Sequence, residues 1–454
     1  MKRWKVWSVL WLVPLFLVAC NIQTPGWLQA LQGGEQECVV RVGIIYSKSS
    51  SGLAQKKGYE MALEEINVDG VAIRDKGDTV RECRLEAVYV DDGADPNEAV
   101  KAVRELYEDE RVWVIVGATS SSSTTPAVGV AEIYKVPFLV PTATNPLITE
   151  QGYKWVFRIN APSTGYAGAA IDFAQNLEQR ASSIDVSTIA IIYENSIYGH
   201  TTAVAAATKA AEHNIQVVAY EVAEKGQDLG PMMMRVKAAD ADILFFAVSS
   251  AADTVDAKTL MEQCYHYGLN PKLYLSAGGD FTKPGFVKEG DEKNRYAEYT
   301  VAATQWTQDV DWSGAAQFVH KYRTAYNLSL GESVPLESAE AYAAMYVVQD
   351  ALERAVELDA DSVLRSLLAT EKRRALSEDE RQVVMESIRD AFVEADLETA
   401  FGPIKFDVTG QNAHEVLVMQ VIDGTFVTVY PEYHLLAEYQ DKAPVFPVPP
   451  WSER

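Results

Sequence analysis

Residues 39–67 read VVRVGIIYSKSSSGLAQKKGYEMALEEIN, an apolar strand pattern at 39–46 that passes through a polar turn into a helical pattern. The same unit recurs downstream: LEAVYV at 85–90 precedes the helical PNEAVKAVRELYED at 96–109, and VWVIVG at 112–117 precedes another helical segment. Strands that are apolar on both faces and alternate with helices indicate parallel sheets covered on both sides. The sequence therefore predicts an α/β fold of the doubly wound kind.

A second series of strands begins after residue 157, with the apolar runs STIAIIY, VVAY, ILFFAV and KLYLSA. The chain leaves this series near 299–304, runs through a long helical stretch, and ends in a strand pair at 415–431 in which Asp423-Gly424 is a hairpin signal. We expect two lobes, followed by a C-terminal tail at 441–454. The first lobe would comprise 38–160 plus 306–403, and the second 161–305 plus 404–440.

The first twenty residues have the pattern of an export signal. A basic segment at 2–5 precedes an apolar run at 6–19, which is shorter than the roughly 20 residues of a membrane-spanning helix. The run ends in LVAC, which resembles the lipobox of bacterial lipoproteins. We therefore expect a signal peptide at 1–19, lipid chains on Cys20 that hold the protein at a membrane surface, and a tether at 20–37. The alternatives are an ordinary secretory signal and an uncleaved anchor.

Composition and motifs exclude several function classes. The 454-residue chain has a formal net charge of −24, whereas nucleic-acid binding needs clustered Lys and Arg, so we expect no nucleic-acid partner. The sequence lacks the glycine-rich dinucleotide fingerprint, the P-loop and the G-x-S-x-G elbow. We expect neither an enzyme nor a cofactor.

The chain has four cysteines, at positions 20, 38, 83 and 264, and six scattered histidines. No metal site is expected, because no C-x-x-C pair or His/Cys cluster occurs. Cys38 and Cys83 each open an apolar strand, so pairing of those strands would bring their sulfurs together. Since an exported protein meets an oxidising compartment, we predict a Cys38–Cys83 disulfide. Cys264 is expected to be a buried, small apolar residue.

Two polar loops follow neighbouring strands. The loop GATSSSST at 117–124 leads into a helix, whose free N–H groups and partial positive charge suit a small anion such as a carboxylate. Helix capping alone would also explain these hydroxyls. A second loop, PTATNP at 141–146, follows the next strand and should project to the same end of the sheet. Together the loops favour a binding site.

The order of these motifs resembles a known family. From Val39 to Pro431 the chain is similar to the type I periplasmic substrate-binding proteins of ABC transporters, specifically the branched-chain amino acid binding family. The motifs that carry the resemblance are SGLAQKKGYEMALEEIN, DDGADPNEAVKAVRELYED, VGATSSSSTTPAV, VPFLVPTATNP, FRINAPS, GPIKFDVTGQN and DGTFVTVYP. The resemblance implies two Rossmann-like lobes joined by three crossovers, closing on a ligand without catalysis.

The resemblance also implies site residues. Ser121, followed by Ser122, matches the serine whose hydroxyl and following N–H groups take a ligand α-carboxylate, and Thr142 and Thr144 match the loop that holds the α-ammonium and assists with the carboxylate. Tyr198 matches a tyrosine that reaches across when the lobes close. Asp280 lies near the family's acidic partner of the ammonium, in a loop that has diverged around Gly278 and Gly279.

The expected function follows from these matches. We expect an extracytoplasmic, monomeric lipoprotein that captures a small zwitterion, an amino acid above all, and delivers it to an ABC permease. Residues 248–251 are small where many relatives have bulky ones, which would leave room for a larger side chain. The sequence therefore does not predict which side chain the ligand carries. A ligand-sensing receptor of the same fold, and a binder of amides, urea or another small solute, are the alternatives.

Overall fold

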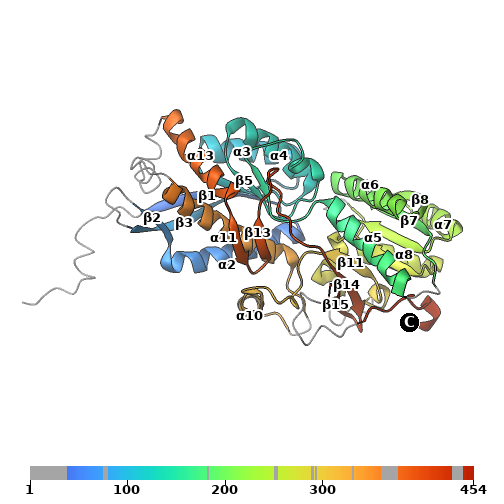
Figure 1. The fold of residues 1–454 in the computed structure, drawn as a ribbon. Coiled ribbons are helices and arrows are strands. Elements are labelled where there is room, and N and C mark those ends of the chain that lie inside the picture. The colour runs from blue at the N-terminus through green and yellow to red at the C-terminus, as the bar shows by residue number, and fades with distance from the viewer. Residues whose placement is uncertain are drawn as a thin grey trace, which may run out of the picture. The chain divides into compact units, whose positions relative to one another are not determined.

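The structure is a computed structural model that describes residues 38–74, 80–180, 184–249, 254–287, 291, 294–329, 332–358, 377–431 and 443–454. Cys38–Arg454 forms one compact unit, and its buried apolar residues gather in two separate cores. We call the residues around these cores the first lobe and the second lobe (Figure 1). The predicted signal peptide, Cys20 and the tether lie outside the described residues.

The first lobe is built on a six-stranded sheet with the order β2-β3-β1-β4-β5-β6, in which only the edge strand β2 runs antiparallel to its neighbour. Its strands are β1 (Val39–Tyr46), β2 (Val71–Arg74), β3 (Val80–Asp91), β4 (Val114–Val116), β5 (Phe138–Val140) and β6 (Val156–Arg158). Its helices are α2 (Ser50–Asp69), α3 (Pro96–Glu108), α4 (Ser121–Tyr134), η1 (Pro146–Ile148), α10 (Ala315–Tyr326), α11 (Leu336–Leu358) and α13 (Glu378–Val393). Every residue of β4 and β5 is buried, as a sheet covered on both faces requires.

The second lobe is built on a seven-stranded sheet with the order β15-β14-β11-β10-β9-β7-β8. Its parallel strands are β7 (Thr188–Glu194), β8 (Gln216–Ala223), β9 (Ile243–Ala247), β10 (Leu273–Ser276) and β11 (Val301–Thr304), and the antiparallel pair is β14 (Leu417–Ile422) and β15 (Thr425–Tyr430). Its helices are α5 (Ser163–Arg180), α6 (Ile197–Glu212), α7 (Gly230–Ala239), α8 (Ala257–Tyr267), η2 (Gly279–Thr282), η3 (Pro284–Val287) and α9 (Asn294–Ala297). The predicted doubly wound α/β fold with two lobes is confirmed.

The chain passes between the two cores three times. Ile159 belongs to the first core and Ala161 to the second, and the chain returns between Ala303 and Trp306. The third passage comes after residue 406. The strands β12 (Asp396–Thr399) and β13 (Gly402–Lys405) pair with each other, and Phe406 still packs in the first core, so the crossing falls between Phe406 and Val418.

Gln305 ties the three passages together. Its side-chain oxygen accepts hydrogen bonds from the Ala161 N–H and the Tyr166 hydroxyl, and its amide nitrogen donates to the His414 carbonyl. This one buried side chain therefore lies on one of the three crossing segments and is hydrogen bonded to the other two.

Two further features fix the ends of the described unit. Cys38 and Cys83 form a disulfide next to the parallel pairing of β1 with β3. The C-terminal tail docks on the second lobe, where Trp451 packs against Tyr265 and Tyr274 and the Arg454 guanidinium lies 4.0 Å from the Trp451 ring centroid. Cys264 is buried in the same lobe. Within the described ranges, no helix combines the length and the apolar character that a bilayer crossing needs.

Candidate functional site

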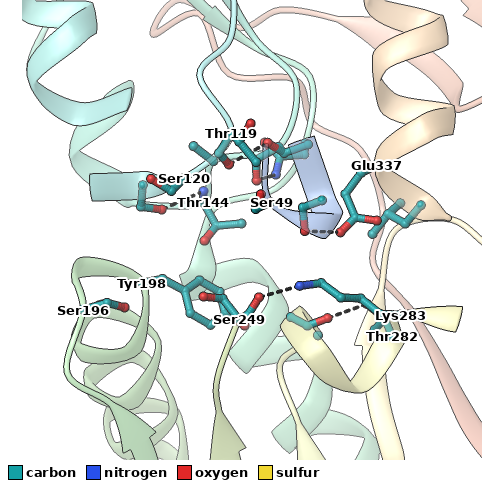
Figure 2. A pocket seen from close by; sticks show the side chains of 18 of the residues that line it. Ser49, Thr119, Ser120, Thr144, Ser196, Tyr198, Ser249, Thr282, Lys283 and Glu337 are labelled. Atoms are coloured by element: carbon teal, nitrogen blue, oxygen red, sulfur yellow. Dashed lines mark hydrogen bonds between the residues drawn. The ribbon is translucent and has the colours of Figure 1, made fainter. Parts of the chain in front are cut away.

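A pocket lies at the carboxyl ends of strands from both sheets (Figure 2). On the first lobe it is lined by the turns after β1, β4 and β5, which are neighbours in the sheet. On the second lobe it is lined by the segments after β7, β9 and β10. Parallel strands place their following loops at one edge, so residues far apart in sequence meet here.

Hydroxyl groups dominate the first-lobe wall, and a buried glutamine organises two of them. Gln55 is buried in α2; its Nε2 donates to Thr142 Oγ1 over 2.9 Å, and its Oε1 accepts from Thr119 Oγ1 over 2.7 Å. The Thr142 hydroxyl in turn donates to the Thr119 carbonyl over 3.0 Å. Thr142 therefore lines the pocket with its hydroxyl already bonded to protein groups.

The turn that leads into α4 depends on a glycine. A Cβ at Gly117 would lie 2.3 Å from the Ile45 carbonyl oxygen, so only glycine lets the chain pass this close to β1. Ser120 then caps the helix by accepting from the Ser123 N–H, which puts Ser121 and Ser122 in the first turn, facing the pocket.

Ser121 and Thr144 form the part of the wall best suited to an anion. Ser121 Oγ accepts from the Thr144 and Asn145 N–H groups, each over 3.2 Å, so its own O–H can act as a donor. Thr144 is 9% exposed and lines the pocket, and no group among the described residues hydrogen bonds to its hydroxyl. A buried hydroxyl without a partner costs free energy unless something bonds to it, so Thr144 points to a ligand contact.

The second-lobe wall has a buried carboxylate at its base. Glu194 is fully buried at the end of β7 and accepts from the Ser249 N–H and Ser249 hydroxyl, each over 2.7 Å, and from the Ser196 hydroxyl over 2.5 Å. These bonds fix the segments after β7 and β9 against each other. Glu194 and Ser249 therefore hold the second-lobe wall, on which Figure 2 shows Ser249 beneath Thr144.

Tyr198 stands on the same wall, below Thr144 in Figure 2. Its hydroxyl donates to the Ala277 carbonyl over 3.3 Å. Burial, and then the nearby Glu194 carboxylate, raise the pKa of the Tyr198 phenol well above its usual range. Tyr198 thus offers the pocket a neutral hydroxyl.

Asp280, the sixth predicted ligand residue, lines an adjoining cavity, whereas Ser121 and Thr144 line the pocket described above. Its carboxylate accepts from the Ala257 N–H at the start of α8 over 2.7 Å and lies 3.8 Å from the Lys283 ammonium. The chain approaches Asp280 through Gly278 and Gly279, whose φ angles of 89° and 64° form a turn that the sequence match could not place. Helix capping explains this carboxylate.

Charged groups that the sequence reasoning missed also line the pocket. Lys283 comes from the second lobe and donates to the Ser249 carbonyl over 2.6 Å. Glu337 and Glu340 come from the start of α11 in the first lobe, and Glu337 accepts from the Ser51 hydroxyl over 2.8 Å. The sequence signal for Glu194 was its place directly after an apolar strand, whereas a glutamate within a long helical pattern carries no such signal.

The structure brings together five of the six predicted ligand residues: Ser121, Ser122, Thr142, Thr144 and Tyr198 line one pocket. Tyr46, at the end of β1, packs against Tyr89 and does not line this pocket. Of the small residues at 248–251, Ser249 lines the pocket, while 250 and 251 lie outside the described residues. In the part of the chain that the structure describes, His, Cys, Asp and Glu side chains form no group of three that could hold a metal ion.

Two α/β lobes with a polar pocket between their strand ends define a class, the hinged binding proteins. The family model for periplasmic binding proteins matches residues 39–425, and the chain belongs to that family. This match, together with the relatives and structures below, confirms the predicted resemblance to the type I periplasmic binding proteins of the branched-chain amino acid group.

The curated relatives match only part of the chain, at modest sequence identity. The Leucine-, isoleucine-, valine-, threonine-, and alanine-binding protein of Pseudomonas aeruginosa is 30% identical over 196 residues, which cover 43% of this chain and 48% of the relative. The matched segments span about half the length of the curated relatives.

Solved structures share the fold over most of the chain. The branched-chain amino acid transporter substrate binding protein LivJ from Streptococcus pneumoniae, in complex with isoleucine, has a TM-score of 0.65 at 20% identity and covers 87% of this chain and 100% of its own. A solute binding protein of an ABC transporter from Rhodopseudomonas palustris, in complex with 3,4-dihydroxy benzoic acid, has a TM-score of 0.67 at 18% identity, covering 86% and 95%. Proteins of this fold have therefore been solved with an amino acid and with an aromatic acid as the ligand.

Proposed function

We propose that this chain captures a small zwitterion, an amino acid above all, between its two lobes and delivers it to an ABC permease. The observation that carries the proposal is the pair formed by Ser121, whose O–H can donate, and Thr144, whose buried hydroxyl has no partner among the described residues. Ser121 lies at the N-terminus of α4 and Thr144 is hydrogen bonded to it, so the two groups suit a carboxylate, because the free N–H groups and the helix dipole favour negative charge.

Closure supplies the second half of the mechanism. The first-lobe hydroxyls take the carboxylate first, and Tyr198 and the other second-lobe groups complete the enclosure when the lobes approach. A ligand shifts this equilibrium only by its differential contacts, and charged hydrogen bonds at about 1.5–3 kcal/mol each are large enough to do so. The closed form would then dock on the permease.

Membrane attachment through lipid on Cys20 is part of the same proposal. The lipobox-like LVAC at 17–20 supports it, together with the family's role in transport. A lipid tether would keep the binding protein within reach of its permease. Globomycin treatment of expressing cells, with mass analysis of the mature N-terminus, tests the anchor: an unmodified N-terminus at another residue would refute it.

Most of the side chains that line the pocket carry a polar group that can bond to a small polar ligand. Its lining side chains are mostly hydroxyls and charges, and the aliphatic ones are Ala94, Ala143, Ala277 and Leu336. An amide or urea-type solute remains the second candidate on the same observation.

A thermal-shift panel tests the function. Amino acids, amides, urea, benzoates and short peptides are each added to the purified protein, because a bound ligand raises the melting temperature by mass action. We expect a shift from at least one small polar amino acid. A shift from non-amino compounds alone would overturn the amino acid assignment.

A further inference from the structure

Among the carboxyl groups of described residues that line the pocket, only that of Glu340 accepts no hydrogen bond from another described residue. It lies in α11, is 2% exposed and lines the pocket. No residue that the structure describes donates a hydrogen bond to it. The negative charge of the nearby Glu337 opposes the ionisation of Glu340. Glu194, Glu337 and Asp280, by contrast, each accept from protein donors.

The position is unfavourable for an anion on its own. A buried carboxylate without a partner costs several kcal/mol, so such a group keeps its proton or acquires a cation. Burial, and then the charge of Glu337 three residues earlier on the same helix, raise the pKa of Glu340 well above its usual range. The phenols that couple to it, Tyr59 of α2 and Tyr166 of α5, are buried and supply no positive charge.

A second unused acceptor lines the same pocket. Asn160 is 1% exposed; its amide nitrogen donates to the Thr142 carbonyl over 2.6 Å, while its side-chain oxygen has no donor among the described residues. A carboxyl group and an amide oxygen are both acceptors that suit an N–H-rich cation. The pocket therefore pairs the hydroxyl donors of Ser121 and Thr144 with buried acceptors from α11 and from the segment after β6.

We propose that Glu340, with the side-chain oxygen of Asn160, binds a cationic nitrogen of the ligand. This inference rests on the proposed function, in which Ser121 and Thr144 take the ligand carboxylate. It makes the substrate class an acid that also carries a protonated amine, and it moves the acidic role predicted for Asp280 to another lobe and another helix. A plain carboxylic acid would leave both acceptors without a donor.

Four related probes identify the nitrogen. L-lysine carries an α-ammonium and a side-chain ammonium, L-norleucine carries only the first, and 6-aminohexanoate only the second; hexanoate carries neither. Calorimetry with each probe, and with the best amino acid of the panel, compares the unaltered protein with Glu340→Gln. We expect Glu340→Gln to lower the affinity for amine-bearing ligands by about 10-fold to 100-fold, the range for a charged hydrogen bond, and to leave hexanoate unchanged. Selective loss with L-norleucine assigns the α-ammonium, and with 6-aminohexanoate the side-chain ammonium.

Proton release provides a readout that a purely structural role would not change. A ligand cation should drive Glu340 to ionise, so binding at pH 7 should release a proton, visible as a dependence of the binding heat on the ionisation enthalpy of the buffer. Glu340→Gln should remove this release. Equal proton release in both proteins would overturn the inference.

The outcomes separate the two proposals. Thr144→Val should weaken amine-bearing and amine-free acids alike, because it removes only the carboxylate contact. If no amino acid binds the unaltered protein, the proposed function fails. If amino acids bind with dependence on Thr144 while Glu340→Gln leaves their affinity unchanged, this inference alone fails.

Stability offers a check that needs no ligand. A raised pKa in the folded protein means that Glu340 favours folding at low pH and opposes it as the pH rises above the ordinary carboxyl range. Glu340→Gln should therefore match the unaltered protein at pH 4 and melt at a higher temperature at pH 8. A lower melting temperature for Glu340→Gln at pH 8 would contradict a carboxyl without a partner.

Discussion

The two lobes line one pocket by different means. The first-lobe wall consists of hydroxyls from three adjacent strand ends, held by Gln55 and by backbone groups, and it leaves Thr144 without a partner among the described residues. The second-lobe wall contains Glu194, Ser249 and Lys283, whose polar groups already bond to one another. The first lobe is therefore prepared to take a ligand, while the second presents polar groups that are already bonded to one another.

The supports behind the walls differ as well. On the first lobe, the fully buried Arg158 donates to the Gln411 side chain over 2.6 Å, to the Asn145 carbonyl over 2.7 Å and to the Thr149 hydroxyl over 3.0 Å. It thereby links the loop that bears Thr144 to the last crossing between the lobes. On the second lobe, the Glu194 carboxylate supports the wall instead, by accepting hydrogen bonds from Ser249 and Ser196.

The largest effect is expected from removing the first-lobe support. Arg158→Met would leave several buried acceptors without donors, at about 1–3 kcal/mol each, so we expect a loss of at least about 3 kcal/mol in the free energy of unfolding. Arg235→Met is the matched control, because Arg235 pairs with Glu221 on the surface and should cost about 1 kcal/mol at most. Urea denaturation measures both. Equal losses would show that Arg158 does not support the first-lobe wall.

The next effect concerns the wall itself. Thr144→Val keeps the shape of the side chain and removes its hydroxyl, so we expect a drop of about 10-fold to 100-fold in the affinity for the best ligand of the panel, with the melting temperature of the free protein preserved. Thr324→Val removes a hydroxyl that donates within α10 on the surface and serves as the control. Unchanged affinity for Thr144→Val would remove Thr144 from the site.

A smaller effect is expected on the second lobe. Tyr198→Phe removes one neutral hydroxyl from a wall that makes its contacts on closure, so affinity should fall by about 2-fold to 10-fold, mainly through faster dissociation. Stopped-flow fluorescence gives the two rates, and Tyr220→Phe on β8, outside the pocket, is the control. A loss as large as that of Thr144→Val would make the two walls equivalent and break the comparison.

The sequence predicted the parts of the site that are local in the chain. Ser121 and Thr144 follow buried strands directly, and the rule that ligands meet the carboxyl ends of parallel strands places such residues without knowledge of distant contacts. The alternation of strands and helices predicted both lobes for the same reason. The disulfide pair also followed from strands that are neighbours in the sheet.

Other parts depend on contacts between distant segments. Gln55 looks like any polar residue on a helix, and only the meeting of α2 with the loops after β4 and β5 gives it a role. Glu340 lies more than two hundred residues after Ser121, on a helix whose pattern predicts only a cover for the sheet. The local pattern of the β12–β13 pair does not indicate which core the pair joins, and only its packing places Phe406 in the first core.

The smallest effect is expected at Asp280, and it tests which wall holds the acid that faces the ligand. Asp280→Asn keeps an oxygen that can accept from the Ala257 N–H and loses only the charge near the start of α8, so it should cost about 0.3–1 kcal/mol of stability. Ligand affinity should stay within about 2-fold, since a charge outside the pocket contributes little to binding. Calorimetry with the same amino acid used for Glu340→Gln makes the two values directly comparable. If Asp280→Asn weakens binding more than Glu340→Gln does, the cationic nitrogen belongs to the second lobe and the assignment to α11 is wrong.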